Sequence, residues 1–222
     1  MKKLKILTFL LLFIIPFFQS CKNEDPISSF TDPRDGEIYK IVKIGRDYWF
    51  AENLRYAGNI PQITGYIDWG STSQPAWCYY TNDPFFNMNY GKLYNWYAVS
   101  TGNICPSGWH VPSKEEWQKL SDYLGGNDES GGKLKSTASD WEEPNFGATN
   151  SSQFSGLPGG NRFYNGIYDG YGSYGIWWSS TGNLSLNMTH SAFGRSIYHS
   201  SATNNEPLLS KSYGLSCRCI KD

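Results

Sequence analysis

The stretch Val111-Pro112-Ser113-Lys114-Glu115-Glu116-Trp117 carries the strongest local signal in this chain. Ser113 followed three residues later by Glu116 is the pattern of a capping box, in which each residue bonds the other's backbone at a helix start. Apolar residues then recur at the spacing of one helical face, at Trp117, Leu120, Tyr123 and Leu124. Two glycines directly after Leu124 end the pattern. The stretch therefore predicts an amphipathic helix over residues 113–124.

Short strands are expected on both sides of this helix. Residues 36–54 predict a hairpin with turn residues at Gly45-Arg46-Asp47. Before the turn, apolar residues occur at both odd-numbered and even-numbered positions, which indicates a strand buried on both faces. Residues 176–181 predict a buried strand, so we assign Trp177 and Trp178 to the core. Residues 188–198 and 213–220 predict closing strands, and 55–90 and 137–175 mostly long loops. The expected fold class is α+β.

The beginning of the chain has the pattern of an export signal. Lys2, Lys3 and Lys5 precede an apolar run that ends at Phe18, which is too short to span a bilayer. A small residue, Ser20, then precedes Cys21, as in the lipobox of bacterial lipoproteins. We therefore expect a signal peptide over residues 1–20, lipid on Cys21, a polar tether over 21–31 and one domain over 32–222.

Composition limits the classes of partner. Residues 1–20 contain three Lys and no acidic residue, which leaves 16 basic and 20 acidic residues and a formal net charge of −4. No basic stripe is present, so we do not expect nucleic acid as a partner. An acidic stretch after Cys21 is similar to surface-export signals of Bacteroidetes lipoproteins. We expect an outer-membrane lipoprotein; exposure of the domain at the cell surface is a second expectation.

The cysteines indicate disulfides rather than a metal or redox site. If Cys21 carries lipid, four remain, and an even number in an oxidising compartment predicts two bridges. No CxxC pattern occurs and the three His are isolated, so we expect no metal and no cofactor. Cys217 and Cys219 are two apart in an expected strand, where a bridge between them would oppose the extended backbone. We expect them to pair separately, with Cys78 and Cys105.

Several segments together resemble a known family. They are Asp35-Gly36-Glu37-Ile38-Tyr39-Lys40, Trp49-Phe50-Ala51-Glu52-Asn53-Leu54, Gly91-Lys92-Leu93-Tyr94-Asn95-Trp96-Tyr97, Cys105-Pro106-Ser107-Gly108-Trp109-His110-Val111-Pro112, Gly131-Gly132-Lys133-Leu134-Lys135, Phe154-Ser155-Gly156-Leu157-Pro158-Gly159-Gly160, Trp177-Trp178-Ser179-Ser180-Thr181 and Cys217-Arg218-Cys219-Ile220-Lys221-Asp222. In this order they resemble the Fibrobacter succinogenes major paralogous domain, over about residues 32–222. Phe50 stands where that family often has Met.

The resemblance implies a fold and a pairing of the cysteines. The family is remotely similar to C-type-lectin-like domains and to formylglycine-generating enzymes, which implies twisted antiparallel sheets with long loops. It often has one terminal Cys where this chain has two. The extra Cys217 then matches the extra Cys78, which implies the bridges Cys78–Cys217 and Cys105–Cys219. The family carries no established biochemical function.

Three functions follow as hypotheses. We expect a non-enzymatic module, held to the membrane by its lipid, that binds a glycan or another envelope protein. Its candidate ligand-binding residues are the tyrosines of a Gly-rich stretch, Tyr164, Tyr168, Tyr171 and Tyr174. The alternatives are an oxidase-like enzyme using Cys217 and Cys219, and a purely structural envelope protein. Glu143-Pro144-Asn145 matches a calcium-site triplet of mannose-type lectins. Calcium requires six to eight oxygen ligands, which three residues do not supply, so we interpret this segment as a loop.

Overall fold

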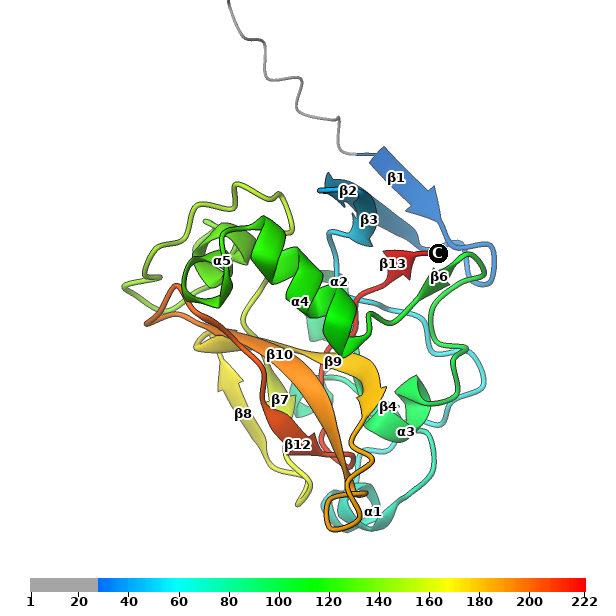
Figure 1. Cartoon of the computed structure of the whole chain (residues 1–222). Coiled ribbons are helices and arrows are strands. Elements are labelled where there is room, and N and C mark those ends of the chain that lie inside the picture. Colours follow the sequence, from blue (N-terminus) through cyan, green and yellow to red (C-terminus); the bar gives the residue numbers. More distant parts are fainter. Residues whose placement is uncertain (1–27) are drawn as a thin grey trace, which may run out of the picture.

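A computed structural model describes residues 28–222 of the chain (Figure 1). The expected signal peptide and Cys21 lie outside the described residues. The strands are β1 (Ser28–Thr31), β2 (Ile38–Ile44), β3 (Asp47–Phe50), β4 (Trp77–Cys78), β5 (Leu93–Tyr94), β6 (Trp109–His110), β7 (Gly159–Arg162), β8 (Tyr168–Tyr171), β9 (Tyr174–Gly182), β10 (Ser191–Tyr198), β11 (Asn204–Asn205), β12 (Leu208–Ser210) and β13 (Ile220–Lys221). The helices are α1 (Tyr66–Ser71), η1 (Tyr80–Asn82), η2 (Pro84–Phe86), α2 (Asn87–Tyr90), α3 (Trp96–Val99), α4 (Lys114–Tyr123) and α5 (Asn127–Leu134).

The fold is α+β, as expected, with several short antiparallel sheets and few helices. One sheet has the order β1-β2-β3-β13-β6. A second has the order β11-β10-β12, with β9 pairing β10, and β4–β5 and β7–β8 form two small sheets. No helix among the described residues is long and apolar enough to cross a membrane.

The predicted β2–β3 hairpin is confirmed, with Ile41 opposite Phe50 and Val42 opposite Trp49. Its two faces contribute to different cores. Tyr39, Ile41 and Phe50 pack into one cluster. Val42, Ile44 and Trp49 pack into another. Burial on both faces explains why apolar side chains of both parities occur in β2. The strand β1 was not expected: Ser28–Thr31 pairs with β2, so the last four residues of the predicted tether belong to the sheet.

The predicted helix is also confirmed, as α4. Ser113 accepts a hydrogen bond from the Glu116 backbone, and the Glu116 side chain accepts one from the Ser113 backbone, which completes the capping box. Trp117 and Leu120 are buried in the cluster that contains Trp49. Replacing such an N-cap typically costs about 1 kcal/mol, so the cap fixes where the helix begins and how it meets the core.

The closing segments are only partly regular. Trp177 and Trp178 of β9 are both buried, as predicted, and belong to different clusters. The predicted strand over residues 213–220 is wrong except at its end, where β13 forms. Gly214, Leu215 and Ser216 instead make single bridges to Arg162, Tyr94 and Trp177 in turn. Because successive residues pair with different segments, no ladder develops there.

Candidate functional site

The four candidate tyrosines lie on or beside the β7–β8 hairpin, but they do not form one platform. Tyr164 is 56% exposed and Tyr171 is 42% exposed. Tyr168 and Tyr174 are half-buried. The Tyr168 hydroxyl donates to Asn82 Oδ1 at 2.8 Å. The Tyr174 hydroxyl donates to Asn161 and to Asp169. These bonds tie Tyr168 and Tyr174 to the scaffold, whereas Tyr164 and Tyr171 have exposed rings; the ligand-binding role of the four tyrosines stays a prediction.

Tyr164 belongs to an exposed patch at the tip of the hairpin. Its ring stacks on Tyr213, with centroids 6.0 Å apart and an angle of 23° between the planes. Tyr66, Ile67 and Ile167 are also more than half exposed. A Cβ at Gly166 would come within 2.6 Å of Tyr66 Cα, so the hairpin turn and α1 are in close contact. We call these exposed side chains, with Tyr164, the hairpin-tip patch.

Tyr171 lies at the other end of β8, in a different setting. Its ring contacts those of Tyr80, Phe86 and Tyr90, with centroids 5.2–5.6 Å apart. Its hydroxyl is 3.2 Å from that of Tyr90, which in turn donates to Asp140 Oδ1 at 3.0 Å. Burial and these two neighbours raise the pKa of Tyr90, so its phenol stays protonated as a donor. This chain of contacts connects the exposed Tyr171 to a carboxylate.

A pocket of about 280 Å³ opens beside Asp140; we call it the Tyr171 pocket. Its wall combines apolar side chains with side chains that hydrogen-bond. The lining residues are Lys40, Ala51, Glu52, Met88, Asn89, Asp140, Ser155 and Leu157. Tyr171 does not line this pocket; it is connected to the lining residue Asp140 through the Tyr90 hydroxyl. Among the described residues, Asp140 Oδ2 and the Asn89 amide bond no other group, so both are available to a ligand.

Arg218 holds the floor of this pocket in place. It is fully buried and donates to Phe50 O at 3.2 Å, to Asn53 Oδ1 and Ser155 O at 3.0 Å, and to Phe154 O. Burial lowers the pKa of Arg218 to about 9, a shift that the charge of Glu52 opposes. The guanidinium is therefore charged at neutral pH and joins the end of β3 to the loop that carries Ser155.

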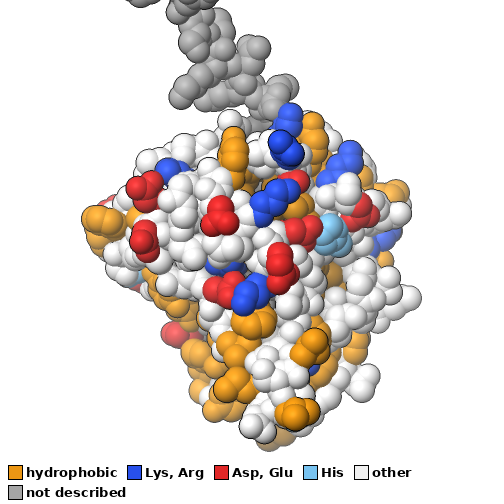
Figure 2. Space-filling view, in the orientation of Figure 1, with side chains coloured by type: hydrophobic (Ala, Val, Ile, Leu, Met, Phe, Trp, Pro, Cys, Tyr) orange, Lys and Arg blue, Asp and Glu red, His pale blue; other side chains and the backbone are white. Residues whose placement is uncertain are grey.

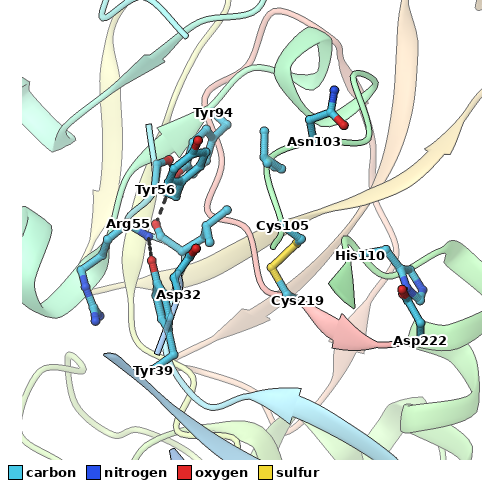
Figure 3. Close-up of a disulfide and its surroundings, with 12 residues drawn as sticks. Asp32, Tyr39, Arg55, Tyr56, Tyr94, Asn103, Cys105, His110, Cys219 and Asp222 are labelled. Carbon is cyan, nitrogen blue, oxygen red and sulfur yellow. Dashed lines mark hydrogen bonds and ion pairs between the residues drawn. A yellow bond between two sulfur atoms is a disulfide. The ribbon is translucent and has the colours of Figure 1, made fainter. Parts of the chain in front are cut away.

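The structure contains one of the two disulfides that the resemblance implied. Cys105 and Cys219 are bonded, close to Tyr94 and Tyr39 on one side and His110 on the other (Figure 3). The expected Cys78–Cys217 bridge is absent, and both are free, buried thiols. Successive residues of a strand point to opposite faces. Leu93 and Tyr94, the two residues of β5, therefore point into different cores. Cys78 packs in the cluster of Leu93 and Cys217 in the cluster of Tyr94, so the two thiols lie apart.

The free thiols also bear on the oxidase alternative. Cys219 is engaged with Cys105, so Cys217 and Cys219 do not form a pair of free thiols. Burial raises the pKa of Cys78 to about 11 and that of Cys217 well above its ordinary value. Since the thiolate is the reactive form, both side chains are inert at neutral pH.

The Glu143-Pro144-Asn145 segment is a loop, as we interpreted it. The Glu143–Pro144 peptide bond is cis. The Asn145 side-chain amide donates to Ser136 O at 3.1 Å. Within residues 28–222, no group of three or more His, Cys, Asp or Glu is placed to hold a metal ion.

Sequence reasoning missed most of the pocket. Of its neighbours only Tyr171 was a candidate, because it lies in an aromatic, Gly-rich stretch. Asp140 comes from a loop, Asn89 from α2 and Glu52 from the end of β3, three segments far apart in the chain. Arg218 carried only a weak signal, its position between two cysteines of an expected terminal strand; that it is itself buried and fully bonded is seen only in the structure.

Comparison with known proteins gives one match. The family model of the Fibrobacter succinogenes major domain matches residues 42–221. No curated protein and no solved structure matches the chain.

Proposed function

This chain belongs to the Fibrobacter succinogenes major domain family, and we propose that it is a non-enzymatic, lipid-anchored module that binds envelope glycan in the Tyr171 pocket. The proposal includes export, lipid on Cys21 and attachment to the outer membrane. It also includes a C-type-lectin-like arrangement of the short sheets. The sequence before Ser28 supports the anchor, because a lysine-bearing start, a short apolar run and Ser20-Cys21 occur in the order of a lipoprotein signal.

The pocket beside Tyr171 is the observation that carries the binding role. A sugar presents hydroxyl groups around its edge and C–H groups on its faces. Asp140, Glu52 and Asn89 supply acceptors and an amide donor for hydroxyls. Leu157, Met88 and Ala51 supply apolar contacts for C–H groups. A volume of about 280 Å³ lies at the small end of the range for ligand pockets, which suits one sugar residue of a longer chain.

Three alternatives differ in what supports them. The hairpin-tip patch supports an envelope protein as partner, because exposed apolar and aromatic side chains gather there without a polar pocket. An oxidase-like enzyme is less supported, because its expected cysteine pair is divided between a disulfide and a buried thiol. A purely structural envelope protein would need neither surface.

The test is a binding screen with matched tyrosine variants. The chain from residue 22 onward is applied to an array of bacterial-envelope and plant oligosaccharides, and dissociation constants are measured for those retained. Asp140→Asn keeps the contact with Tyr90 but removes a charged acceptor, and should weaken binding roughly tenfold. Tyr171→Ala removes the ring and hydroxyl that contact Tyr90, the residue that holds Asp140, and should weaken it by about as much.

The control is Tyr164→Ala, which removes another exposed tyrosine, one that belongs to the hairpin-tip patch. It should leave glycan affinity unchanged. Retention of no oligosaccharide would overturn the glycan proposal. Loss of affinity in Tyr164→Ala but not in Tyr171→Ala would move the site to the hairpin tip.

A further inference from the structure

A hollow of about 530 Å³ lies between the loop after β3, the segment before β4 and the turn after α3. Three of the residues in its wall carry side-chain carboxamides: Asn59, Gln74 and Asn103. None of its lining residues is Lys, Arg, His, Asp or Glu. We call this hollow the amide pocket.

The three carboxamides are available to a ligand. All three residues are exposed. Gln74 and Asn103 form hydrogen bonds through their backbones only, and Asn59 bonds no other group among the described residues. A carboxamide has one oxygen that accepts hydrogen bonds and two N–H groups that donate them. The amide pocket therefore offers donors and acceptors without charge.

Buried aromatic side chains hold the first segment of this wall. The hydroxyl of Tyr94 donates to Tyr56 O (Figure 3). Trp77 Nε1 donates to Ile60 O at 2.8 Å. Tyr94 is fully buried and Trp77 nearly so. The loop after β3 is thus fixed from beneath by two donors that solvent barely reaches.

The other two segments are held in the same way. Asn95, which is fully buried, donates from Nδ2 to Gln74 O at 2.8 Å. Arg34 donates from Nη1 to Asn103 O at 2.9 Å. The backbone under each segment is therefore fixed while the carboxamides stay unbonded, which is the arrangement of a preorganised binding site.

Charges close to the amide pocket favour neither an anion nor a cation. A neighbouring hollow shares residues 56–59 and carries both signs, from Arg34, Arg55, Lys92, Asp35 and Glu37. Arg34 pairs with Asp32, and Arg55 with Glu37, each at 2.7 Å. On the face shown in Figure 2, charged side chains gather over α4, none of whose residues lines the amide pocket.

A sugar suits this wall better than a peptide does. A peptide bound in an extended form needs free backbone groups along its groove. Here the carbonyls described above already accept hydrogen bonds, and Pro61 and Pro75 have no N–H. Sugar hydroxyls can bond the carboxamides, while Ile60 and the two prolines supply apolar contacts for C–H groups. The volume is nearly twice that of the Tyr171 pocket, which suits about two sugar residues.

We infer that the amide pocket binds an uncharged oligosaccharide, at a site separate from the Tyr171 pocket. No residue lines both pockets. The inference goes beyond the proposed function and does not depend on the Tyr171 pocket. A glycan long enough to reach both pockets would be held more tightly than by either one.

Titration calorimetry of the full chain tests the ligand class. The chain, in a detergent without a sugar headgroup, is titrated with cellohexaose, maltohexaose, mannohexaose, hexagalacturonate and hexaproline. At least one neutral oligosaccharide should bind. Salt at 1 M shortens the Debye length to about 3 Å and should leave its affinity unchanged. Binding of hexagalacturonate alone, or of hexaproline alone, would overturn the inference.

Paired substitutions test the residues. Gln74→Ala with Asn103→Ala removes two carboxamides and should weaken binding of the neutral oligosaccharide more than about tenfold. The fold should be kept, because both residues keep their backbone bonds. Gln62→Ala is the matched control, since Gln62 is an exposed carboxamide next to Pro61 that does not line the pocket. It should bind as the parent does; an equal loss there, or no loss in the double variant, contradicts the assignment.

Asp140→Asn separates this site from the Tyr171 pocket, because Asp140 lines only the latter. A loss of affinity in the Gln74→Ala, Asn103→Ala variant alone supports the amide pocket and leaves the Tyr171 pocket without support. A loss in Asp140→Asn alone supports the Tyr171 pocket and refutes the amide pocket. Binding of no oligosaccharide by the parent chain refutes both.

Discussion

At the scale of single residues, three buried cationic side chains each donate hydrogen bonds to several backbone carbonyls. Arg162 donates to the carbonyls of Ile63, Thr64, Gly65 and Gly166, and Lys135 to those of Phe146, Tyr198 and Ser201. Arg218 does the same beside the Tyr171 pocket. A loop-rich interior leaves carbonyls that no helix or sheet satisfies, and each costs free energy if it stays unpaired. Forked or multivalent donors satisfy several of them at once.

Replacing Arg218 tests this role. Arg218→Met fills much of the volume but removes the donor to the carbonyls of Phe50, Phe154 and Ser155 and leaves Asn53 Oδ1 only its bond from Trp177 Nε1, so it should lower the free energy of unfolding by about 3 kcal/mol or more. Arg218→Lys should recover part of the loss. Denaturant unfolding measures both, with the exposed Arg46→Met as a control expected within about 0.5 kcal/mol of the parent. A loss from Arg218→Met no larger than that of the control would contradict the role.

At the scale of elements, His110 connects β6, β13 and α4. Its Nδ1 is 2.6 Å from Asp222 Oδ1 and its Nε2 is 2.9 Å from Glu116 Oε1. Partial burial by itself would lower the pKa of His110, but the bonds to Asp222 and Glu116 outweigh it and the pKa is raised. Glu116 is also the capping residue of α4. The His110 ring therefore joins Asp222 to the start of the main helix.

The raised pKa predicts the pH dependence of stability. A histidine whose pKa is raised in the folded state stabilises it fully below the unfolded value, about 6.5, and loses this contribution as pH rises through the folded value. The free energy of unfolding should therefore fall as pH rises from 6 towards 9, and should fall less in His110→Gln. Denaturant titrations at several pH values measure this. His190→Gln is the control, because it changes an exposed ring that bonds no other side chain among the described residues. Its free energy of unfolding should depend on pH as that of the parent does. If His190→Gln weakened the pH dependence as much as His110→Gln, the assignment to His110 would be refuted.

At the scale of the whole molecule, one disulfide joins distant parts of the chain. Cys105 precedes β6 and Cys219 precedes β13, 114 residues later. The bridge thus fixes the closing segment across the first sheet. Closing a loop of about 100 residues is worth about 4.7 kcal/mol in the chain-entropy model.

Removing this bridge should lower the free energy of unfolding more than removing either free thiol. Cys105→Ala with Cys219→Ala should lower the free energy of unfolding by about 4 kcal/mol. Thiol titration of the native parent chain should detect neither Cys78 nor Cys217, and unfolding without reductant should expose both. Peptide mapping should give the single link Cys105–Cys219. A Cys78–Cys217 link, or two reactive thiols in the native protein, would contradict this assignment.

Local sequence determined the parts of this fold that depend on near neighbours. The capping box at Ser113 and Glu116 defines the start of α4, because both partners lie within one helical turn. The apolar pattern and turn residues of residues 38–50 specify the β2–β3 hairpin. The run at Trp177 and Trp178 identifies a strand with two buried faces. In each case the information lies within a few residues of where it acts.

Only the tertiary structure decided the pairing of the thiols and the candidate site. Cys78 and Cys217 remain apart because β5 directs Leu93 and Tyr94 into different cores, which no local pattern reveals. Tyr164 and Tyr171 are close in sequence but lie at opposite ends of the hairpin, while Asp140, Asn89 and Glu52 converge from distant parts of the chain. Such contacts depend on how long, irregular segments pack, and a loop has no period from which its position could be predicted.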